Sequence, residues 1–441
     1  MNEARQHAQY ADQLPKRLRL CLIGQKVSVL SRSADTGLLW PLARGLTERG
    51  HEVTIISTSS PLKRAEVFRD GIRAYYLNEN QPQYKTIRFT DAVYKKFISL
   101  NNEKPFDLVH SMDNSGFKIG RQKTSLNISM AYDVEATQMA ELFSILSESK
   151  SGAGSFINTT RKLIFNFLQN YFARDRGLLD TADGIFVTTP QQRMILERYY
   201  LFPDYHTYTV PYGINLGDLT PKSESENFKL KLNIPENAQI ILANSDFTST
   251  HEVTPLLRAF EKVVLKKPNT YLLLLGSGPQ LKNVEFEMLN LALGSRVIMP
   301  GEVLAEEMLE CILASPIYID LSSRSTGLEP SLIEAMAQKK VVIGSELSPI
   351  SEVIEDGVDG FLVRPADVET LSLLLDKIMT GTGINRDQIG EKARQKIVEA
   401  FNRNKMIDSL IDAYRQILLR SDKFKQRASF KLFFSKLIRP V

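Results

Sequence analysis

Two carboxylates, Glu329 and Glu334, stand close together in the segment TGLEPSLIEAMA (326–337) and are well suited to bind a ligand. The longer stretch 326–363 predicts a turn, a short helix that Glu334 opens, a buried strand, a capped second helix and a strand bounded by glycine. A buried carboxylate can accept hydrogen bonds from ribose hydroxyls, and amides at a helix start can face phosphate oxygens. We therefore expect a sugar nucleotide at the carboxyl ends of a parallel sheet.

A second helix start and a glycine turn supply further candidate ligands for the nucleotide. Ser348 is a natural N-cap, and Pro349 fits the first helical position. The amides around Ser348–Ile350 would then be available to a phosphate. Gly276 and Gly278 form a glycine turn after the apolar run LLLL, a signal that is weak by itself.

Short apolar strands alternate with amphipathic helices along the whole chain. Strands are predicted at 17–24, 51–57, 106–111, 125–133 and 182–189 in the first half, and at 238–246, 269–279, 295–303 and 315–323 in the second. The clearest predicted helices are 37–50, with Asp35 or Thr36 as its cap, 254–267, and a long pattern over 386–419. This order predicts an α/β fold with two Rossmann-like, doubly wound parallel sheets facing a cleft, a preferred place for ligands.

Composition narrows the class of protein. The chain has 441 residues, 43% of them apolar and 24% charged, which suits two soluble domains. The two cysteines, no signal peptide and no run long enough to span a bilayer predict a cytoplasmic protein. No metal-ligand spacing and no nucleic-acid-binding module are recognisable.

Several stretches, taken in order and spacing, carry a resemblance to a known family. They are GLLWPLARGLTERGHEV, VPYGIN, LLLLGSGP, VIMPGEV and the 326–363 segment. Together they closely resemble the retaining family-4 glycosyltransferases (glycosyl transferases group 1), which have the two-domain GT-B fold. The resemblance implies transfer of a sugar from a nucleotide-diphosphate donor to a hydroxyl acceptor with retention, in cell-surface polysaccharide or glycolipid synthesis, without a metal or other cofactor.

The resemblance also divides the chain. Residues 1–216 would form the acceptor-side Rossmann-like domain, and 217–395 the nucleotide-sugar domain. A helix over 396–419 would return to the first domain, and 420–441 would follow it as a basic amphipathic tail.

The predicted donor site matches the family in part. Relatives commonly carry a Glu, seven residues and a second Glu; Glu334 matches the second, which usually holds the nucleotide ribose. Thr326 stands at the first position, whose Glu usually contacts the donor sugar. Glu329 can supply a carboxylate from the same turn, or it can be an acid that favours the helix start.

The cations that neutralise the donor diphosphate in the family are replaced. Asp246 stands at the Arg position and would repel a diphosphate, whereas His251, at the Lys position, could serve when protonated. Arg258 on the following helix is expected to face solvent. Arg324 is the better candidate, with an ordinary loop cation as its alternative.

The first-domain site is also altered. Tyr132 stands where many relatives have a His, and could offer its hydroxyl to the sugar or pack in the core. His110, at another strand end, either faces the acceptor or is a hydrogen-bonded structural residue. Of the family's Gly-rich loop only Gly37 remains, and it would still permit the close approach of a phosphate or sugar.

Two other functions remain open. A GT-B protein that lacks the diphosphate cations could be a weak or inactive scaffold or regulatory subunit of a polysaccharide-assembly complex. A sugar-nucleotide epimerase on the same fold fits the tail and hinge motif less well.

The C-terminal tail has a composition of its own. Residues 420–441 hold seven basic side chains and one acid, Asp422. On a helical projection one face carries Phe430, Phe433, Phe434, Leu437 and Ile438. Such a helix can lie on an anionic lipid surface, or its aromatic face can dock on the protein body. Membrane contact would make a lipid-linked acceptor plausible and the protein peripheral at the inner membrane face.

Overall fold

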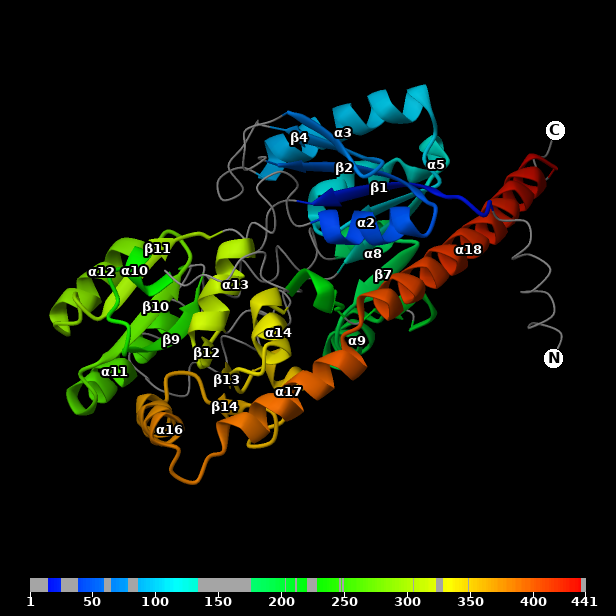
Figure 1. Cartoon of the computed structure of the whole chain (residues 1–441). Helices are drawn as coiled ribbons and strands as arrows, with labels where there is room; N and C mark the ends of the chain where they lie inside the picture. Colours follow the sequence, from blue (N-terminus) through cyan, green and yellow to red (C-terminus); the bar gives the residue numbers. More distant parts are fainter. Residues whose placement is uncertain are drawn as a thin grey trace, which may run out of the picture.

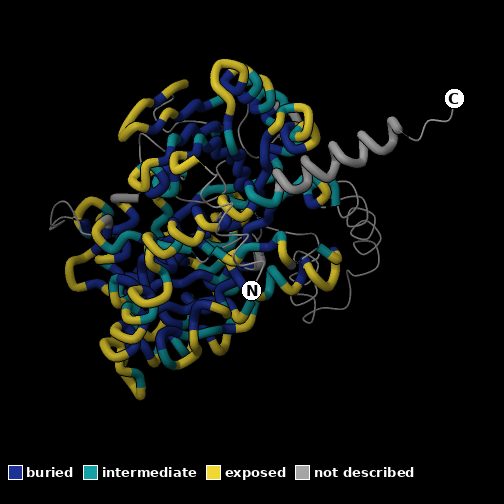
Figure 2. The backbone as a smooth tube through the Cα atoms, turned by 90° about the vertical axis from the view of Figure 1, so that its right-hand side faces the viewer, coloured by how far each residue is buried: buried dark blue, intermediate teal, exposed yellow. Residues whose placement is uncertain are grey.

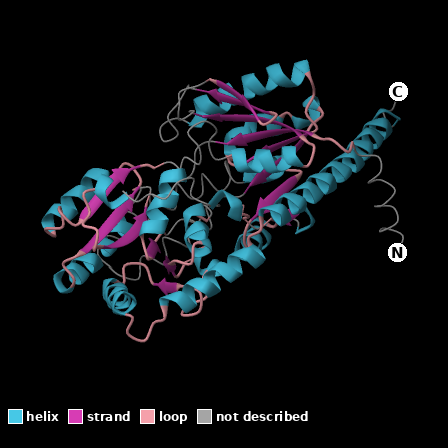
Figure 3. Cartoon of the chain, viewed as in Figure 1, coloured by secondary structure: helices cyan, strands magenta, loops and turns pink. Residues whose placement is uncertain are grey.

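The computed structural model contains two α/β domains and a long C-terminal helix (Figure 1). It describes residues 15–24, 39–58, 65–77, 86–133, 176–202, 204–210, 212–219, 228–245, 247, 250–303, 305–322, 328–347 and 349–437. Over 421–437 only the backbone is described. Strands gather in two separate groups with helices around them (Figure 3). The predicted fold class, with two doubly wound domains, is confirmed.

Among the described residues, the first sheet has eight strands in the order β3-β4-β2-β1-β5-β6-β7-β8. Neighbours are parallel except β3 and β4, a hairpin that turns at Asp70-Gly71 with both residues at positive φ. The strands are β1 (Arg19–Gly24), β2 (Glu52–Thr58), β3 (Glu66–Arg69), β4 (Ile72–Leu77), β5 (Leu108–Ser111), β6 (Ser129–Asp133), β7 (Gly184–Val187) and β8 (Thr207–Thr209).

The second sheet has six described strands in the order β11-β10-β9-β12-β13-β14, and all of them are parallel. They are β9 (Gln239–Asn244), β10 (Thr270–Leu275), β11 (Val297–Gly301), β12 (Ile317–Asp320), β13 (Val341–Ser345) and β14 (Phe361–Val363). The predicted boundary between residues 216 and 217 falls in the connection between the two sheets.

Helices cover both faces of each sheet, and alternate residues along the strands pack into separate cores on the two faces. The buried residues lie inside each domain and the exposed ones around it (Figure 2). The helices are α2 (Trp40–Glu48), α3 (Thr86–Glu103), α4 (Phe117–Arg121), α5 (Lys123–Leu126), α8 (Arg176–Thr181), α9 (Pro190–Tyr200), α10 (Phe228–Lys231), α11 (Thr250–Lys266), α12 (Leu281–Asn290), α13 (Ala305–Ala314), α14 (Pro330–Ala337), α15 (Ile350–Val353), α16 (Val368–Thr380), α17 (Arg386–Ala400) and α18 (Arg403–Leu437).

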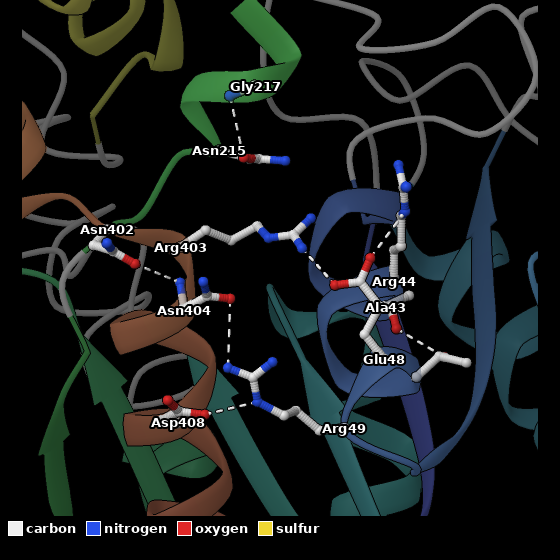
Figure 4. Close-up of polar contacts among 11 residues, drawn as sticks. Ala43, Arg44, Glu48, Arg49, Asn215, Gly217, Asn402, Arg403, Asn404 and Asp408 are labelled. Carbon is white, nitrogen blue, oxygen red and sulfur yellow. Dashed lines mark hydrogen bonds and ion pairs between the residues drawn. The ribbon is translucent and has the colours of Figure 1, made fainter.

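Helix α18 packs against the first domain, which confirms the predicted return. Its buried positions recur at helical spacing and join the core of the first sheet: Ile407, Leu410, Ile411, Tyr414 and Ile417. Ion pairs join α18 to the end of α2 and to its C-cap residue Arg49 (Figure 4): Arg403 with Glu48, and Arg49 with Asp408 at 2.9 Å. The C-terminal helix is therefore part of the first domain's core.

Two segments that join the domains are tied to each other. The amide of Ile214 donates to the carbonyl of Phe401 at 2.9 Å, and the amide of Arg403 donates to the carbonyl of Ile214 at 3.1 Å. Gly213 is required here because a Cβ at this position would lie 2.8 Å from the Cα of Arg403. The two crossings of the chain therefore form one short, paired link.

Several predicted boundaries were wrong. Helix α2 begins at Trp40 after Leu39, so neither Asp35 nor Thr36 is its N-cap; both lie outside the described residues. The strand predicted at 125–133 begins at Ser129, because α5 and a left-handed Asn127 precede it. The pattern at 386–419 is two helices that separate at Phe401-Asn402.

No described helix combines the length and the apolarity that crossing a bilayer requires. Both cysteines, Cys21 and Cys311, are buried and free.

Candidate functional site

The carboxyl edge of the second sheet gathers polar side chains at the point where the chain reverses direction across the sheet. The chain builds from β9 toward β11, then returns to the other side of β9 with β12. Strand β9 ends at Asn244 and its neighbour β12 ends at Asp320. Ligands of doubly wound sheets bind outside the carboxyl ends of the strands at such a switch point.

A buried hydrogen-bond network attaches the start of α14 to this edge. Asn244 Nδ2 donates to Ser331 Oγ at 2.9 Å, and the Tyr318 hydroxyl shares a 2.7 Å hydrogen bond with the same oxygen. Ser331 is the second residue of α14. The helix start is therefore held against β9 and β12, and its first amides are fixed at the switch point.

The side-chain oxygen of Asn244 is a free hydrogen-bond acceptor within the described part of this site. The Asn244 side chain is buried, and its Oδ1 has no hydrogen-bond partner within the described part of the chain. Buried polar atoms are nearly always paired, so this oxygen is suited to accept a hydrogen bond from a ligand.

Glu334 and Glu329 lie at the same edge, but their positions in α14 differ from the prediction. Helix α14 begins at Pro330, so Glu329 occupies the N-cap position and Glu334 is inside the helix; the prediction that Glu334 opens it was wrong. The Glu329 side chain makes no capping hydrogen bond. Both carboxylates are buried: Glu329 is 7% exposed and Glu334 is 5% exposed.

The carboxylates act on a common neighbour, Tyr318. Burial raises the pKa of the Tyr318 phenol well above its ordinary value, and the negative charges of Asp320, Glu329 and Glu334 raise it further. Three buried acids therefore lie close enough to this phenol for their charges to act on it. Buried acids require hydrogen-bond donors, and the hydroxyls of a sugar or ribose are such donors.

The glycine turn and the second predicted helix start are both described in part. Gly276 has a φ of 116°, which favours glycine, and its amide donates to the Gly301 carbonyl at 2.9 Å. The carbonyl of Gly278 accepts from the Leu281 amide at 3.2 Å. Ile350 is the first residue of α15 and packs on Gly344 of β13.

The predicted start of this second helix, whose amides were expected to face a phosphate, differs from the observed one. Pro349 is the N-cap of α15, not its first helical residue. Ser348, the predicted cap, lies outside the described residues.

The predicted cations cannot be placed at the site. Arg258 is exposed and pairs with Glu287 of α12 at 3.0 Å, as expected for a solvent-facing residue. The backbone of His251 belongs to α11, but its side chain is outside the described part of the structure. Four further candidates lie wholly outside it: Gly37, Asp246, Arg324 and Thr326.

In the first domain the two predicted residues face opposite sides of the sheet. Tyr132 is fully buried on the α3 face, and its hydroxyl lies 3.2 Å from Thr181 Oγ1. His110 is buried on the α18 face between Tyr414 and Asp133. These placements match the core and structural alternatives, and a catalytic role for either residue stays a prediction.

Sequence reasoning missed Asn244, Tyr318, Ser331 and Asp133. A polar residue at the end of an apolar strand was the available signal for Asn244 and Asp133. Nothing in the sequence indicated that Tyr318 and Ser331, thirteen residues apart, would share a hydrogen bond. No group of three or more metal-ligating side chains occurs among the described residues.

Comparison with known proteins agrees with this architecture. The model of the glycosyl transferase 4-like domain matches residues 39–213, and that of glycosyl transferases group 1 matches residues 224–396. The first range covers β2 to β8, and the second covers β9 to β14.

Relatives and solved structures extend the likeness over most of the chain. N-acetyl-alpha-D-glucosaminyl L-malate synthase of Bacillus anthracis is 23% identical over 87% of this chain and 93% of its own length. Alpha-monoglucosyldiacylglycerol synthase of Streptococcus pneumoniae is 24% identical over 57% of this chain and 58% of its own. Sucrose-phosphate synthase of Thermosynechococcus elongatus has the same fold, with a TM-score of 0.71, 20% identity and coverage of 91% and 99%.

A structure of Anabaena Alr3699/HepE superposes with a TM-score of 0.64 and 15% identity, covering 92% of this chain and 100% of that one. These likenesses to solved structures concern the fold, which is GT-B. Both family models and the fold lead to one conclusion: the chain belongs to the group 1 glycosyltransferases.

Proposed function

We propose that the protein transfers a sugar from a nucleotide-diphosphate donor to a hydroxyl acceptor with retention of anomeric configuration. The observation that carries this proposal is the buried carboxylate of Glu334, set beside the fixed start of α14 at the switch point of the second sheet. In the proposal Glu334 accepts hydrogen bonds from the ribose, and Glu329, at the N-cap, accepts from the donor sugar.

The leaving diphosphate needs stabilisation as its bond to the sugar breaks. The proposal assigns this role to amides at the start of α14 and to those of the turn that follows Gly276, whose own amide donates to Gly301, with His251 and Arg324 as the cations. The Tyr318–Ser331–Asn244 network supports it because it fixes the helix start before the ligand arrives. No metal is required in this account.

The relatives indicate which donors and acceptors to test first. Anabaena Alr3699/HepE was solved in complex with UDP-glucose, which makes UDP-sugars the first choice. The Streptococcus pneumoniae relative is a synthase of a glucosylated diacylglycerol, and a Rhizobium meliloti relative acts in lipopolysaccharide core biosynthesis. We propose a role in polysaccharide or glycolipid synthesis on this basis.

A lipid-linked acceptor also fits the C-terminal tail. Helix α18 continues without a break from the part packed on the first domain to Leu437. The tail sequence adds a strong excess of basic residues to this helix. Each basic residue near an anionic surface contributes about 1 kcal/mol. We therefore propose that the protein is cytoplasmic and peripheral at the inner membrane face. A liposome sedimentation assay that compares the full chain with one ending at Leu419 tests this. Equal pelleting would remove this part of the proposal.

The test of the main proposal is a screen of purified protein with UDP-, GDP- and ADP-sugars. Calorimetry measures binding, and release of the nucleoside diphosphate with simple alkyl glycosides measures turnover. The proposal expects one donor to bind with micromolar affinity and to be consumed with retention. Absence of binding by all donors would contradict it.

A non-catalytic subunit is the second candidate, and the acid and histidine at the two family cation positions favour it. It expects binding of a sugar nucleotide without turnover. Restoring both cations, Asp246→Arg with His251→Lys, would then produce measurable turnover, which the original chain would lack. Turnover by the original chain would exclude this candidate.

A further inference from the structure

Asp133 is the exposed member of a hydrogen-bonded chain that runs from the core of the first domain to its surface. It is the last residue of β6, at the carboxyl edge of the first sheet. Its carboxylate Oδ1 lies 2.8 Å from Nε2 of His110, and its side chain is 33% exposed, whereas that of His110 is 2% exposed. The ring Nδ1 of His110 lies 2.6 Å from the hydroxyl of Tyr414, which is fully buried.

With a neutral His110, the two hydrogen bonds that link Tyr414, His110 and Asp133 point in the same direction. A carboxylate only accepts hydrogen bonds, so Nε2 carries the proton and Nδ1 accepts from the Tyr414 hydroxyl. Burial, together with the charge of Asp133, raises the pKa of Tyr414 well above its ordinary value, and the phenol therefore stays a donor. Tyr414 therefore donates to His110, and His110 donates to Asp133.

The surroundings keep this chain rigid. The ring of Phe186 lies 4.7 Å from that of His110 and 5.8 Å from that of Tyr414, measured between centroids. These rings exclude water from the imidazole. Among the described residues Asp133 hydrogen-bonds only His110, so its second oxygen can accept from a ligand.

The alternation of side chains along β6 places Asp133 on the opposite face of the sheet from Tyr132. Tyr132 points to the α3 face, and Asp133 therefore lies on the α18 face with His110. A buried histidine that holds one oxygen of a partly exposed carboxylate is an arrangement that orients the other oxygen.

We propose that Asp133 accepts a hydrogen bond from a sugar hydroxyl of a substrate, and that His110 and Tyr414 are its positioning residues. The proposal rests on the proposed function, because it requires a sugar substrate. The hydroxyl belongs either to the donor sugar or to the acceptor, and both present the same chemistry.

Asp133→Asn tests the proposal, since the amide keeps an acceptor for His110 and loses the charge. Calorimetry on the full chain compares UDP-glucose with UDP, or the corresponding pair if the donor screen selects another base. Transfer assays give KM for the alkyl glycoside acceptor. The matched control is Asp412→Asn, which removes one exposed charge from α18 near Tyr414.

A donor contact predicts that Asp133→Asn weakens UDP-glucose about tenfold and leaves UDP unchanged. An acceptor contact predicts unchanged donor binding and an acceptor KM about tenfold higher. Tyr414→Phe should change the UDP-glucose affinity, or the acceptor KM, in the same direction as Asp133→Asn but by a smaller factor. A merely structural role would not change the ratio of UDP-glucose to UDP affinity.

The proposal is overturned if Asp133→Asn and Asp412→Asn give the same ratio and the same acceptor KM as the original chain. If the original chain binds no sugar nucleotide, the proposed function fails first. The two failures are therefore distinguishable.

Discussion

The two sheets end in polar networks of similar make-up that are supported in different ways. At the second sheet, Tyr318 and Asn244 both bond Ser331 of α14, an element of the same domain. At the first sheet, Tyr414 reaches His110 from α18, which arrives only after the chain has completed the second domain. The network at the second sheet is therefore contained within its own domain, whereas the network at the first sheet depends on the C-terminal helix.

Removing α18 should have the largest effect on this comparison. A chain ending at Asn402 loses six buried large side chains from the first core, Leu418 included, each contributing about 1.5–3 kcal/mol. The total is comparable with the roughly 5–15 kcal/mol that stabilises a whole domain. We expect the first domain to unfold while the second remains folded, as measured by limited proteolysis. The control ends at Arg420, and its first domain should stay protected; cleavage of both truncations alike would contradict the account.

Removing the two tyrosine hydroxyls sharpens the comparison. Tyr414→Phe leaves Nδ1 of His110 buried and unpaired, which should lower the free energy of unfolding by about 1–3 kcal/mol. Tyr318→Phe leaves Ser331 Oγ its bond from Asn244, so the loss should be about 0.5–1.5 kcal/mol. Urea unfolding measures both, with Tyr94→Phe, whose hydroxyl bonds Gln122 at the surface, as control. If Tyr318→Phe lowered the free energy of unfolding more than Tyr414→Phe, the proposed difference between the two networks would be wrong.

The smallest expected effect is a pH dependence of stability that arises in the first domain alone. Burial and the charge of Arg415, on α18, lower the pKa of His51 below its ordinary 6.5, and its Nδ1 accepts from the Leu18 amide at 3.1 Å. A lowered histidine pKa gives stability that is complete above the unfolded pKa and is lost as pH falls toward the folded pKa.

The melting temperature should therefore fall more steeply from pH 7.5 to 5.5 in the original chain than in His51→Gln, which does not titrate. The difference should be a few degrees. Parallel profiles for the two proteins would show that His51 is not the titrating group.

Much of the fold could be predicted from the sequence because buried parallel strands leave a clear pattern. The runs that became β1, β2, β9 and β10 are apolar and bounded by polar turns, and their order fixed the fold class. Boundaries were less accurate where local preferences compete: Asn127 ends a helical turn with a left-handed conformation inside the predicted strand 125–133.

The site could be predicted only in part. Glu329 and Glu334 were found because they share one short segment. His110 and Asp133 needed the knowledge that β5 and β6 are neighbours, and Tyr414 is 304 residues away from His110 along the chain. Pairings over such distances follow from tertiary packing, which no local pattern records.

The central claim is that the Glu334 carboxylate binds the donor at the edge of the second sheet, and calorimetry of Glu334→Gln tests it most directly. Hydrogen bonds to a charged group contribute about 1.5–3 kcal/mol, so the affinity for the preferred sugar nucleotide should fall by at least about tenfold. Glu285→Gln, on the exposed face of α12, should bind as the original chain does. Unchanged affinity in Glu334→Gln would contradict the account.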